Sequence, residues 1–367
     1  MQNTTPRNTS FFSLLYLGIS LLFFIGSFSN CHADMSKFEP RVNAFGRANH
    51  LVVIADEDLW KGAVGDTFKY YFSSAYLILP QPEPIFDLQH WTAYEITSEP
   101  IRQKKRNYLI LGNLADMDSP TTKIIAKDLG EENLHRAQSD KNFNSTIGKN
   151  KWAEGQNLFY LFGNSKEELI ENIKDKFPAI AKKINEADEE LIAATVYAGG
   201  DHIEVMETVK EKLGVDIRIP HDYFLAFDDG STIWLRKETD FLSSNIILHR
   251  LKYTDKSQLT GAGIKAIRDS LGKKLISTEI ENTYMRTNDQ DLPMVTRVIS
   301  LNGNYALEAR GIWDIVNDFM GGPFISYIIH KPDTDELLFV DGFVHAPGKK
   351  KRDYMQQLEY IFRSIKF

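Results

Sequence analysis

The sequence predicts an α+β protein with two domains, each a mainly antiparallel sheet with helices packed on one face. Short apolar runs typical of strands alternate with stretches in which apolar residues recur at helical spacing. With 367 residues, the chain also exceeds the size of one typical core. We therefore expect a signal peptide over 1–30, a tether over 31–48, an N-terminal α/β domain over 49–197 and a C-terminal α+β domain over 198–367.

In the N-terminal domain, short continuous apolar runs predict buried strands over 51–54, 108–111 and 158–162. The stretch 59–62 is expected to begin a helix that reaches Phe72. Three prolines in alternate positions over 79–84 lack backbone donors and predict a linker or edge loop. The polar stretch 140–151 predicts a loop.

A long helix is expected after Ser165, because Ser165 and Glu168 have the spacing of a capping box. Apolar residues at helical spacing follow as far as Ile184. Pro178 lies inside this pattern, and we expect it to kink or restart the helix.

In the C-terminal domain, a connecting helix over 201–213 is expected to end at Gly214. A second helix is predicted around 264–275 and a third from about residue 350, whose apolar stripe includes Leu358 and Phe362. Turn signals at 228–231 and at Asn302 with Gly303 indicate hairpins. The predicted strands are 216–219, 223–227, 232–235, 246–251, 278–284, 295–301, 305–312, 324–329 and 337–345.

Composition and charge limit the functional class. Apolar residues make up 43% and charged residues 25%, which excludes a disordered or fibrous chain. The formal net charge is −7, and Arg7 is the only charged residue among the first thirty. Acidity of this size opposes nonspecific binding to nucleic acid, so we expect no nucleic-acid partner.

The N-terminal segment has the order of a secretory signal, with a polar start that carries Arg7 and an apolar run over 11–28. The single cysteine, Cys31, follows directly, after Ser29 and Asn30. This arrangement resembles that of bacterial lipoproteins, in which such a cysteine is acylated, and Cys31 is the predicted lipid anchor. Ordinary cleavage after Ala33 and an uncleaved transmembrane helix remain the alternatives.

No strong catalytic or metal-binding motif is present. The sequence lacks a phosphate loop, a Gly-x-Ser-x-Gly elbow, a His-Glu-x-x-His motif and a second cysteine for a zinc pair. We therefore predict no catalytic residue, no metal and no cofactor. An acid or base site assembled from scattered residues stays open.

Asp56 and Asp58 follow a predicted strand, where loops of α/β folds often hold ligands. We include them, with the neighbouring Trp60, as candidate binding residues. The alternative is that the two acids interact with the dipole of the following helix. A second unusual feature is the basic run 349–352, because positive charge at a helix start is unfavourable. It is either a contact for anionic headgroups or a solvated turn.

The densest group of candidate residues includes Arg310, Trp313 and Asp318, followed by a Gly-Gly-Pro turn over 321–323. Arg310 and Trp313 on a groove would bind an anionic or planar group. The alternative is structural: a core tryptophan and a cross-strand pair between Glu308 and Arg310.

Several stretches together resemble the family catalogued as domain of unknown function 4837. They are 58–62 with Gly65 and Asp66, 79–84, 318–324 and 342–352, within a body that runs from about residue 48 to Phe367. The resemblance implies lipoproteins of Bacteroidota and therefore the cell envelope. It implies no activity and no catalytic residue.

These observations favour a noncatalytic cell-envelope lipoprotein that binds or scaffolds an envelope protein partner. It would be held to a membrane, the outer membrane being our choice, through its N-terminal lipid. One alternative is a membrane-anchored hydrolase with a scattered acid site around Asp56 and Asp58 or around Arg310 and Asp318. Another is a small-ligand carrier, which predicts an apolar cavity beside Trp313.

Overall fold

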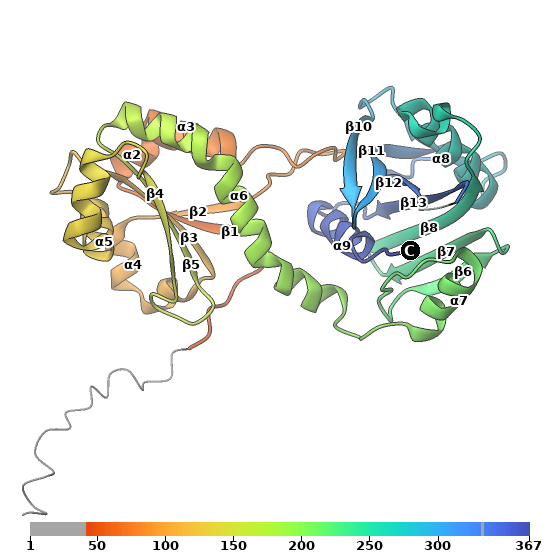
Figure 1. Cartoon of the computed structure of the whole chain (residues 1–367), viewed down its shortest axis with the longest axis horizontal. Coiled ribbons are helices and arrows are strands. Elements are labelled where there is room, and N and C mark those ends of the chain that lie inside the picture. Colours follow the sequence, from red (N-terminus) through yellow and green to blue (C-terminus); the bar gives the residue numbers. More distant parts are fainter. Residues whose placement is uncertain (1–41, 332–333) are drawn as a thin grey trace, which may run out of the picture. The chain divides into compact units, whose positions relative to one another are not determined.

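The computed structural model describes residues 42–331 and 334–367 (Figure 1). The apolar run 11–28 and Cys31 lie outside these residues, so the signal peptide and the lipid anchor stay predictions. In the described part of the chain, no helix combines the length and apolar composition needed to cross a bilayer. Asn43–Phe367 form one compact unit with a five-stranded and an eight-stranded sheet. The predicted α+β class is confirmed, and the domain boundary at 198 stays a prediction.

The N-terminal sheet has the strand order β2-β1-β3-β5-β4. Its strands are β1 (His50–Ile54), β2 (Asp87–Trp91), β3 (Asn107–Asn113), β4 (Ser145–Lys149) and β5 (Asn157–Gly163). Only β4 is antiparallel to its neighbour; the other pairs are parallel. The prediction of a mainly antiparallel sheet is wrong here. Continuous apolar strands such as β3 are buried on both faces, and this favours parallel sheets covered by helices on both sides.

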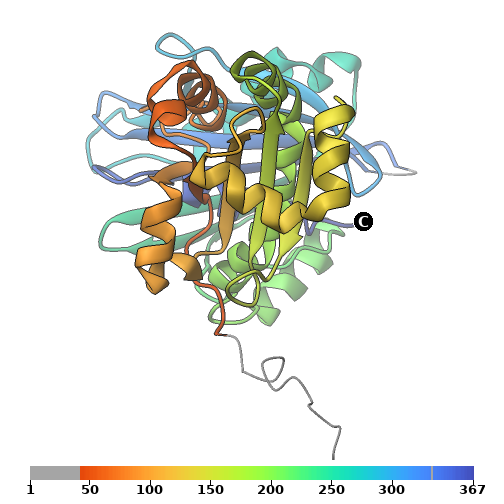
Figure 2. The ribbon, with the colours of Figure 1, turned by 90° about the vertical axis from the view of Figure 1, so that its left-hand side faces the viewer.

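Helices cover both faces of this sheet, which also corrects the expectation of one covered face. On one side lie α3 (Ala63–Phe72) and α6 (Lys166–Val196), which contact Leu51 and Val53 of β1. On the other side of the sheet lie α4 (Ala93–Ser98) and α5 (Pro120–Ser139) (Figure 2). Their apolar residues share a core with Val52 and Ile54. Alternate residues of one strand thus enter two separate cores. The short elements α2 (Glu57–Lys61) and η2 (Pro100–Lys104) complete this part.

The structure bears on three local expectations in this part. The helix predicted to run as far as Phe72 is divided into α2 and α3 at Gly62. The predicted loop 140–151 contains β4, a polar edge strand whose residues are only partly covered. Pro178 lies within α6, which continues as one helix of 31 residues, so the helix does not restart there and a kink stays a prediction. This helix contributes Ile184 to the N-terminal core and Val196 to the C-terminal core.

The C-terminal sheet has the strand order β10-β11-β12-β13-β8-β7-β6, with β9 also paired to β11. All of its pairs are antiparallel, as predicted. Residues 216–219, predicted as a strand, do not form one of the strands of the sheet. Of the strand predicted over 278–284, only Tyr284 lies in a strand, β9. The strands are β6 (Phe224–Asp228), β7 (Thr232–Thr239), β8 (Leu242–Lys252), β9 (Tyr284–Asn288), β10 (Val295–Leu301), β11 (Asn304–Val316), β12 (Gly321–His330) and β13 (Glu336–His345).

Both faces of the C-terminal sheet are also covered, so the prediction of helices on one face is wrong here too. One face packs against α7 (Ile203–Leu213) and α9 (Arg352–Phe362). The opposite face packs against α8 (Gly261–Leu275), which follows the short η3 (Lys256–Leu259). The central strand β12 has eight consecutive buried residues, so neither of its faces can remain exposed to water.

An extended arm, residues 73–86, connects α3 to β2 and includes the proline-rich stretch predicted to be a linker. Its two sides are joined by hydrogen bonds from Tyr76 N to Glu83 O (2.7 Å) and from Ile85 N to Ser74 O (2.9 Å). Leu79 on this arm is buried in the core between the C-terminal sheet and α9. The arm therefore packs as part of the core beneath α9.

Candidate functional site

Asp56 lies directly after β1 and is the N-cap residue of α2. Its carboxylate accepts hydrogen bonds from the hydroxyl of Ser119 and from both N and Oγ1 of Thr121, at 3.3 and 2.8 Å. Ser119 and Thr121 begin α5, which follows β3. Because β2 and β3 flank β1, this is the point where open α/β sheets commonly bind ligands. Here the hydrogen bonds of Asp56 connect the end of β1 to the start of α5.

Asp58 and Trp60 have separate local partners. Asp58 is exposed and pairs with Lys166 at 3.1 Å. The ring of Trp60 stacks on His90, with centroids 4.7 Å apart and an interplanar angle of 7°. The Lys69 ammonium lies 4.8 Å from the centroid of the same ring. These contacts give Asp58 a role in a surface ion pair and Trp60 a role in packing next to α2.

Arg310 lies in a closed network of charges on the α9 side of the C-terminal sheet. Its Nε donates to Glu308 at 2.8 Å, and its Nη1 donates to Glu359 at 2.7 Å and to the Tyr76 hydroxyl at 3.1 Å. Burial lowers the pKa of Arg310, but the attraction of Glu359 and Glu308 outweighs it and raises the pKa overall. The guanidinium therefore stays charged and is held by the protein's own groups.

Trp313 lies on the opposite face of the sheet, toward α8. Side chains alternate along β11, so residues 310 and 313 point to different sides. The structure therefore does not bring Arg310 and Trp313 together on one groove. Asp318 lies in the turn after β11, where its Oδ1 accepts a hydrogen bond from Phe319 N at 2.7 Å. Asp318 thus stabilises this turn, and the structure shows no hydrogen bond or ion pair from it to Arg310 or Trp313 among the described residues.

A cavity of about 100 Å³ lies beside Trp313. Its walls come from β7, β8, β11 and β13 and from residues 276–278, and they include both apolar and polar side chains. The indole nitrogen of Trp313 is buried, and no acceptor for its hydrogen exists among the described residues. Such orphaned donors are rare in folded proteins and need an explanation. Of the sequence-predicted residues, Trp313 is the one that lines this cavity, although its indole nitrogen is itself buried.

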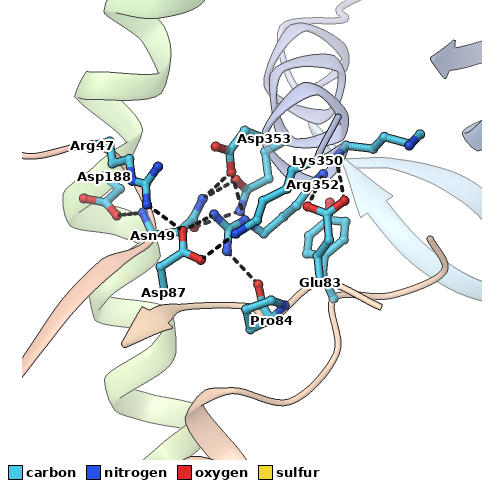
Figure 3. Close-up of polar contacts among 12 residues, drawn as sticks. Arg47, Asn49, Glu83, Pro84, Asp87, Asp188, Lys350, Arg352 and Asp353 are labelled. Carbon is cyan, nitrogen blue, oxygen red and sulfur yellow. Dashed lines mark hydrogen bonds and ion pairs between the residues drawn. The ribbon is translucent and has the colours of Figure 1, made fainter. Parts of the chain in front are cut away.

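A second polar cluster forms where the arm meets the start of α9 (Figure 3). The Glu83 carboxylate accepts hydrogen bonds from the amides of Lys351 and Arg352, at 2.6 and 3.1 Å. Arg352 donates to Asp87 at 2.9 Å and to the carbonyl of Pro84 at 2.6 Å. Thus the basic run at the start of α9 is matched by acids from the arm and β2.

The same cluster continues to α6 through Asn49. Its amide side chain bonds Asp353 (3.2 Å) and Gln356 (2.6 Å) of α9, and its backbone N–H donates to Asp188 at 2.8 Å. Burial raises the pKa of Asp188, although the hydrogen bonds from Asn49 and Asn107 oppose this effect. We call the group formed by Asn49, Glu83, Asp87, Asp188 and Arg352 the junction cluster.

The described residues contain no group of three or more histidine, cysteine, aspartate or glutamate side chains arranged to hold a metal ion. The buried carboxylate of Glu308 is already paired with Arg297 and Arg310. At the Trp313 cavity the structure offers a wall of apolar and polar side chains for binding.

Comparison with known families identifies both parts of the chain. Residues 202–364 match the family described as Domain of unknown function (DUF4837). This part of the protein is therefore similar to the DUF4837 family. Residues 44–197 match a second family, described as Domain of unknown function (DUF8532). The resemblance noted at 58–62 and 79–84 therefore falls within the DUF8532 match, whereas 318–324 and 342–352 fall within DUF4837.

No curated protein matches this chain. Solved structures with partial similarity include the Saccharomyces cerevisiae Ran-binding protein Mog1p and a mutant of protein Mog1. Each is 13% identical, with a TM-score of 0.27, over 41% of this chain and 89% of the other. The human StarD13 (DLC2) lipid transfer and protein localization domain is 10% identical, with a TM-score of 0.20, over 44% of this chain and 94% of the other. These scores are too low to support an argument about fold or function.

The junction cluster joins the DUF8532 part to the DUF4837 part, and sequence reasoning missed most of it. Glu83, Asp87 and Asp188 had no motif that singled them out. The one available signal was the basic run at the start of α9, in DUF4837, which requires a compensating acid. The position of that acid, on an arm more than 260 residues earlier, was not visible in the sequence.

Proposed function

We propose that this protein is a bacterial cell-envelope lipoprotein, anchored to a membrane through Cys31, whose folded body binds a ligand or partner without converting it. The apolar run 11–28 with Cys31 directly after it supports the anchor. The resemblance to Bacteroidota lipoproteins supports the envelope, and the outer membrane is our choice within it.

The observation that carries the binding role is the cavity beside Trp313, whose wall combines apolar side chains with polar ones such as Asn245 and His345. Ligand sites commonly combine apolar walls with a few polar groups that fix the orientation of the ligand. By contrast, the residues named for a hydrolase have structural partners: Asp56 holds the start of α5, and Arg310 is held by Glu308 and Glu359. The small-ligand carrier is therefore favoured over the hydrolase, and an envelope protein is the alternative partner of the same body.

The anchor is tested by membrane fractionation and by the mass of the mature N-terminal peptide. We expect the wild-type chain in the membrane fraction with an acylated Cys31, because each buried acyl methylene contributes about 0.8 kcal/mol. Cys31→Ser should release the chain. His32→Ala, which keeps the thiol, is the matched control and should stay membrane-bound. A free Cys31 thiol, or a mature chain that starts at Asp34, would reject the anchor.

The noncatalytic role is tested by incubating the purified full chain with ester, phosphoester and envelope-polymer substrates. We expect no turnover above the uncatalysed rate. If turnover is found and Asp56→Asn abolishes it while the circular dichroism spectrum is unchanged, the binding role is wrong and the hydrolase alternative replaces it.

A further inference from the structure

The edge strand β4 is paired on one side only, with β5. Phe162 N donates to Asn144 O at 3.0 Å, just before β4 begins. Asn150 N donates to Gln156 O at 3.2 Å, just after β4 ends. The pairing register does not shift between these two points. The backbone groups at positions 144 and 150 therefore face β5, and this fixes the direction of every group between them.

Hydrogen bonding alternates along an antiparallel strand, so every second residue of β4 faces away from β5. The N–H and C=O groups of Ser145, Ile147 and Lys149 point to the open side. Among the described residues these groups have no hydrogen-bond partner on that side. A row of unpaired backbone groups at a sheet edge is a template for another strand.

A pocket of about 350 Å³ lies between this edge and α6. Ile147 lies opposite Phe159 of β5, and both face the side of the sheet that packs against α6. Together with Ala179 and Ile180 of α6 they supply the apolar lining of the pocket. Ile147 is 48% exposed. An apolar side chain on an added strand, placed opposite Ile147, fills this pocket and covers Ile147.

The pocket is positively charged, although the formal net charge of the chain is −7. It is lined by Lys176, Lys182 and Lys183 and by no acidic residue. Lys182 and Lys183 share one carboxylate, that of Glu186, at 3.8 and 2.7 Å. Lys176 has no ion-pair partner among the described residues. An acidic segment is therefore attracted to this edge.

The charge continues along β4 into a neighbouring pocket. Its lining has three cations and two acids, which are Arg106, Lys149, Lys183, Glu186 and Glu190. Lysines at a sheet edge also discourage pairing with a second copy, because a two-fold pairing of β4 brings the lysines of both copies together. The same lysines are matched by a strand that carries acids. The charge thus selects an acidic partner over a second copy of this chain.

We propose that the open edge of β4 binds an extended acidic segment of a partner protein, which adds a sixth strand to the N-terminal sheet, antiparallel to β4. A central apolar side chain enters the pocket opposite Ile147. Acidic side chains two positions to either side lie opposite Ser145 and Lys149. This inference goes beyond the ligand role proposed for the Trp313 cavity and does not depend on it, because β4 belongs to the other sheet.

The test measures the binding of synthetic peptides to the purified full chain in neutral detergent micelles, by the fluorescence anisotropy of an uncharged dye on the peptide. The acidic peptide is Thr-Glu-Thr-Val-Thr-Glu-Thr with blocked ends. A second peptide has lysine in place of both glutamates. Two further peptides are acidic and carry one N-methyl group, either on the valine or on the threonine that follows it.

We expect saturable binding of the acidic peptide that weakens as salt is added, and binding of the lysine peptide that is at least about tenfold weaker. The N-methyl group on valine should weaken binding at least about tenfold, because the valine N–H faces the carbonyl of Ile147. The N-methyl group on threonine should leave binding unchanged, because that nitrogen faces away from β4.

A matched pair of variants tests the pocket. Lys176→Gln should weaken binding of the acidic peptide about threefold, because it removes a cation without a protein partner. Lys174→Gln lies two residues earlier on α6 and changes the net charge equally. Lys174 pairs with Glu171 and does not line the pocket, so this variant should bind as wild type.

Four results overturn the proposal. The first three are measured on the wild-type chain: no saturable binding of the acidic peptide up to about 1 mM, equally tight binding of the lysine peptide, or weakening by N-methylthreonine as large as that by N-methylvaline. The fourth is an equal affinity of the two lysine variants. Because the anchor and turnover are measured separately, failure here rejects the acidic partner of β4 without rejecting the lipoprotein or the Trp313 cavity.

Discussion

The Glu83 carboxylate caps the α-helix that begins at Arg352, although the two residues are 269 positions apart. The N-cap residue of α9, Lys351, has no side-chain acceptor and makes no capping bond of its own. Glu83 replaces it by accepting from two amides of the first turn. The same carboxylate also offsets the positive end of the helix dipole. The arm and α9 are therefore stabilised by each other.

Glu83→Gln should destabilise the fold. The amide retains one acceptor but loses the charge and faces an N–H with its own NH₂ group, so we expect a cost of about 1–2 kcal/mol. The measurement is the free energy of unfolding in urea. Glu167→Gln, at an exposed first-turn position of α6, is the matched control and should change stability by less than about 0.5 kcal/mol. Equal effects of the two substitutions would contradict the capping role.

Asp87 predicts an acid-dependent loss of stability. Burial raises the pKa of Asp87, but hydrogen bonds and charges from Arg352 and Lys350 outweigh it, so the folded pKa lies below the ordinary value. A lowered folded pKa stabilises the fold above the unfolded pKa, and this contribution is lost as the pH falls through the folded value. Asp87→Asn should therefore reduce stability at pH 7 and flatten its fall between about pH 5 and pH 2. An unchanged pH profile in the variant would show that Asp87 does not contribute.

A fully buried ion pair joins α8 to the C-terminal sheet. Arg268 Nε donates to Asp341 Oδ1 at 3.1 Å, and Ser326 donates to the same oxygen at 2.6 Å. Arg268→Met should cost about 3–5 kcal/mol, because it leaves a buried carboxylate without its partner. Arg286→Met breaks the half-exposed pair with Asp314 and should cost about 1 kcal/mol or less. Melting of the two variants by circular dichroism checks the order.

The pH dependence of the Arg268→Met variant gives a second readout. Burial raises the pKa of Asp341 above its ordinary value, and the attraction of Arg268 limits this rise. Without Arg268 the folded pKa rises further, so the variant loses stability as the pH increases from the unfolded pKa through the folded one. The destabilisation should therefore be larger at pH 8 than at pH 5. An equal loss at both values would indicate a packing defect.

Tyr76 connects the arm to the Arg310 network. Its hydroxyl contacts Glu359 and lies 3.1 Å from Arg310 Nη1. Tyr76→Phe keeps the ring and removes this link, and we expect a loss of about 1–2 kcal/mol in the free energy of unfolding. Tyr70→Phe, at a residue 74% exposed, is the control and should be neutral within about 0.5 kcal/mol. A neutral Tyr76→Phe would mean that water replaces the hydroxyl without cost.

Local signals in the sequence were sufficient for several elements. The turn at Asn302 and Gly303 is confirmed, and both residues have the positive φ angles that such turns require, 48° and 88°. The apolar stripe with Leu358 and Phe362 is confirmed as the buried side of α9. These features depend on neighbours within a few positions, and periodicity over such distances is written directly in the chain.

Other elements left no clear local signal. The helix α5 has a weak apolar stripe and contains Gly130 at φ 73°, so periodicity did not predict it. The edge strand β4 is short and polar, because a strand at the edge of a sheet is only partly covered and needs few apolar side chains. The parallel pairing of β1 with β3 depends on the helices between them, which bury both faces of the sheet.

The sequence by itself determined the class of the fold, the confirmed turns and helix faces, the DUF4837 resemblance and the prediction of an anchor at Cys31. Only the tertiary structure decided that Arg310 is enclosed by two carboxylates while Trp313 lines a cavity on the other face. It alone brought Glu83 to the first turn of α9. The physical reason is that periodicity and turn chemistry act within a few residues, whereas ion pairs, caps and cavities depend on which distant segments share a core.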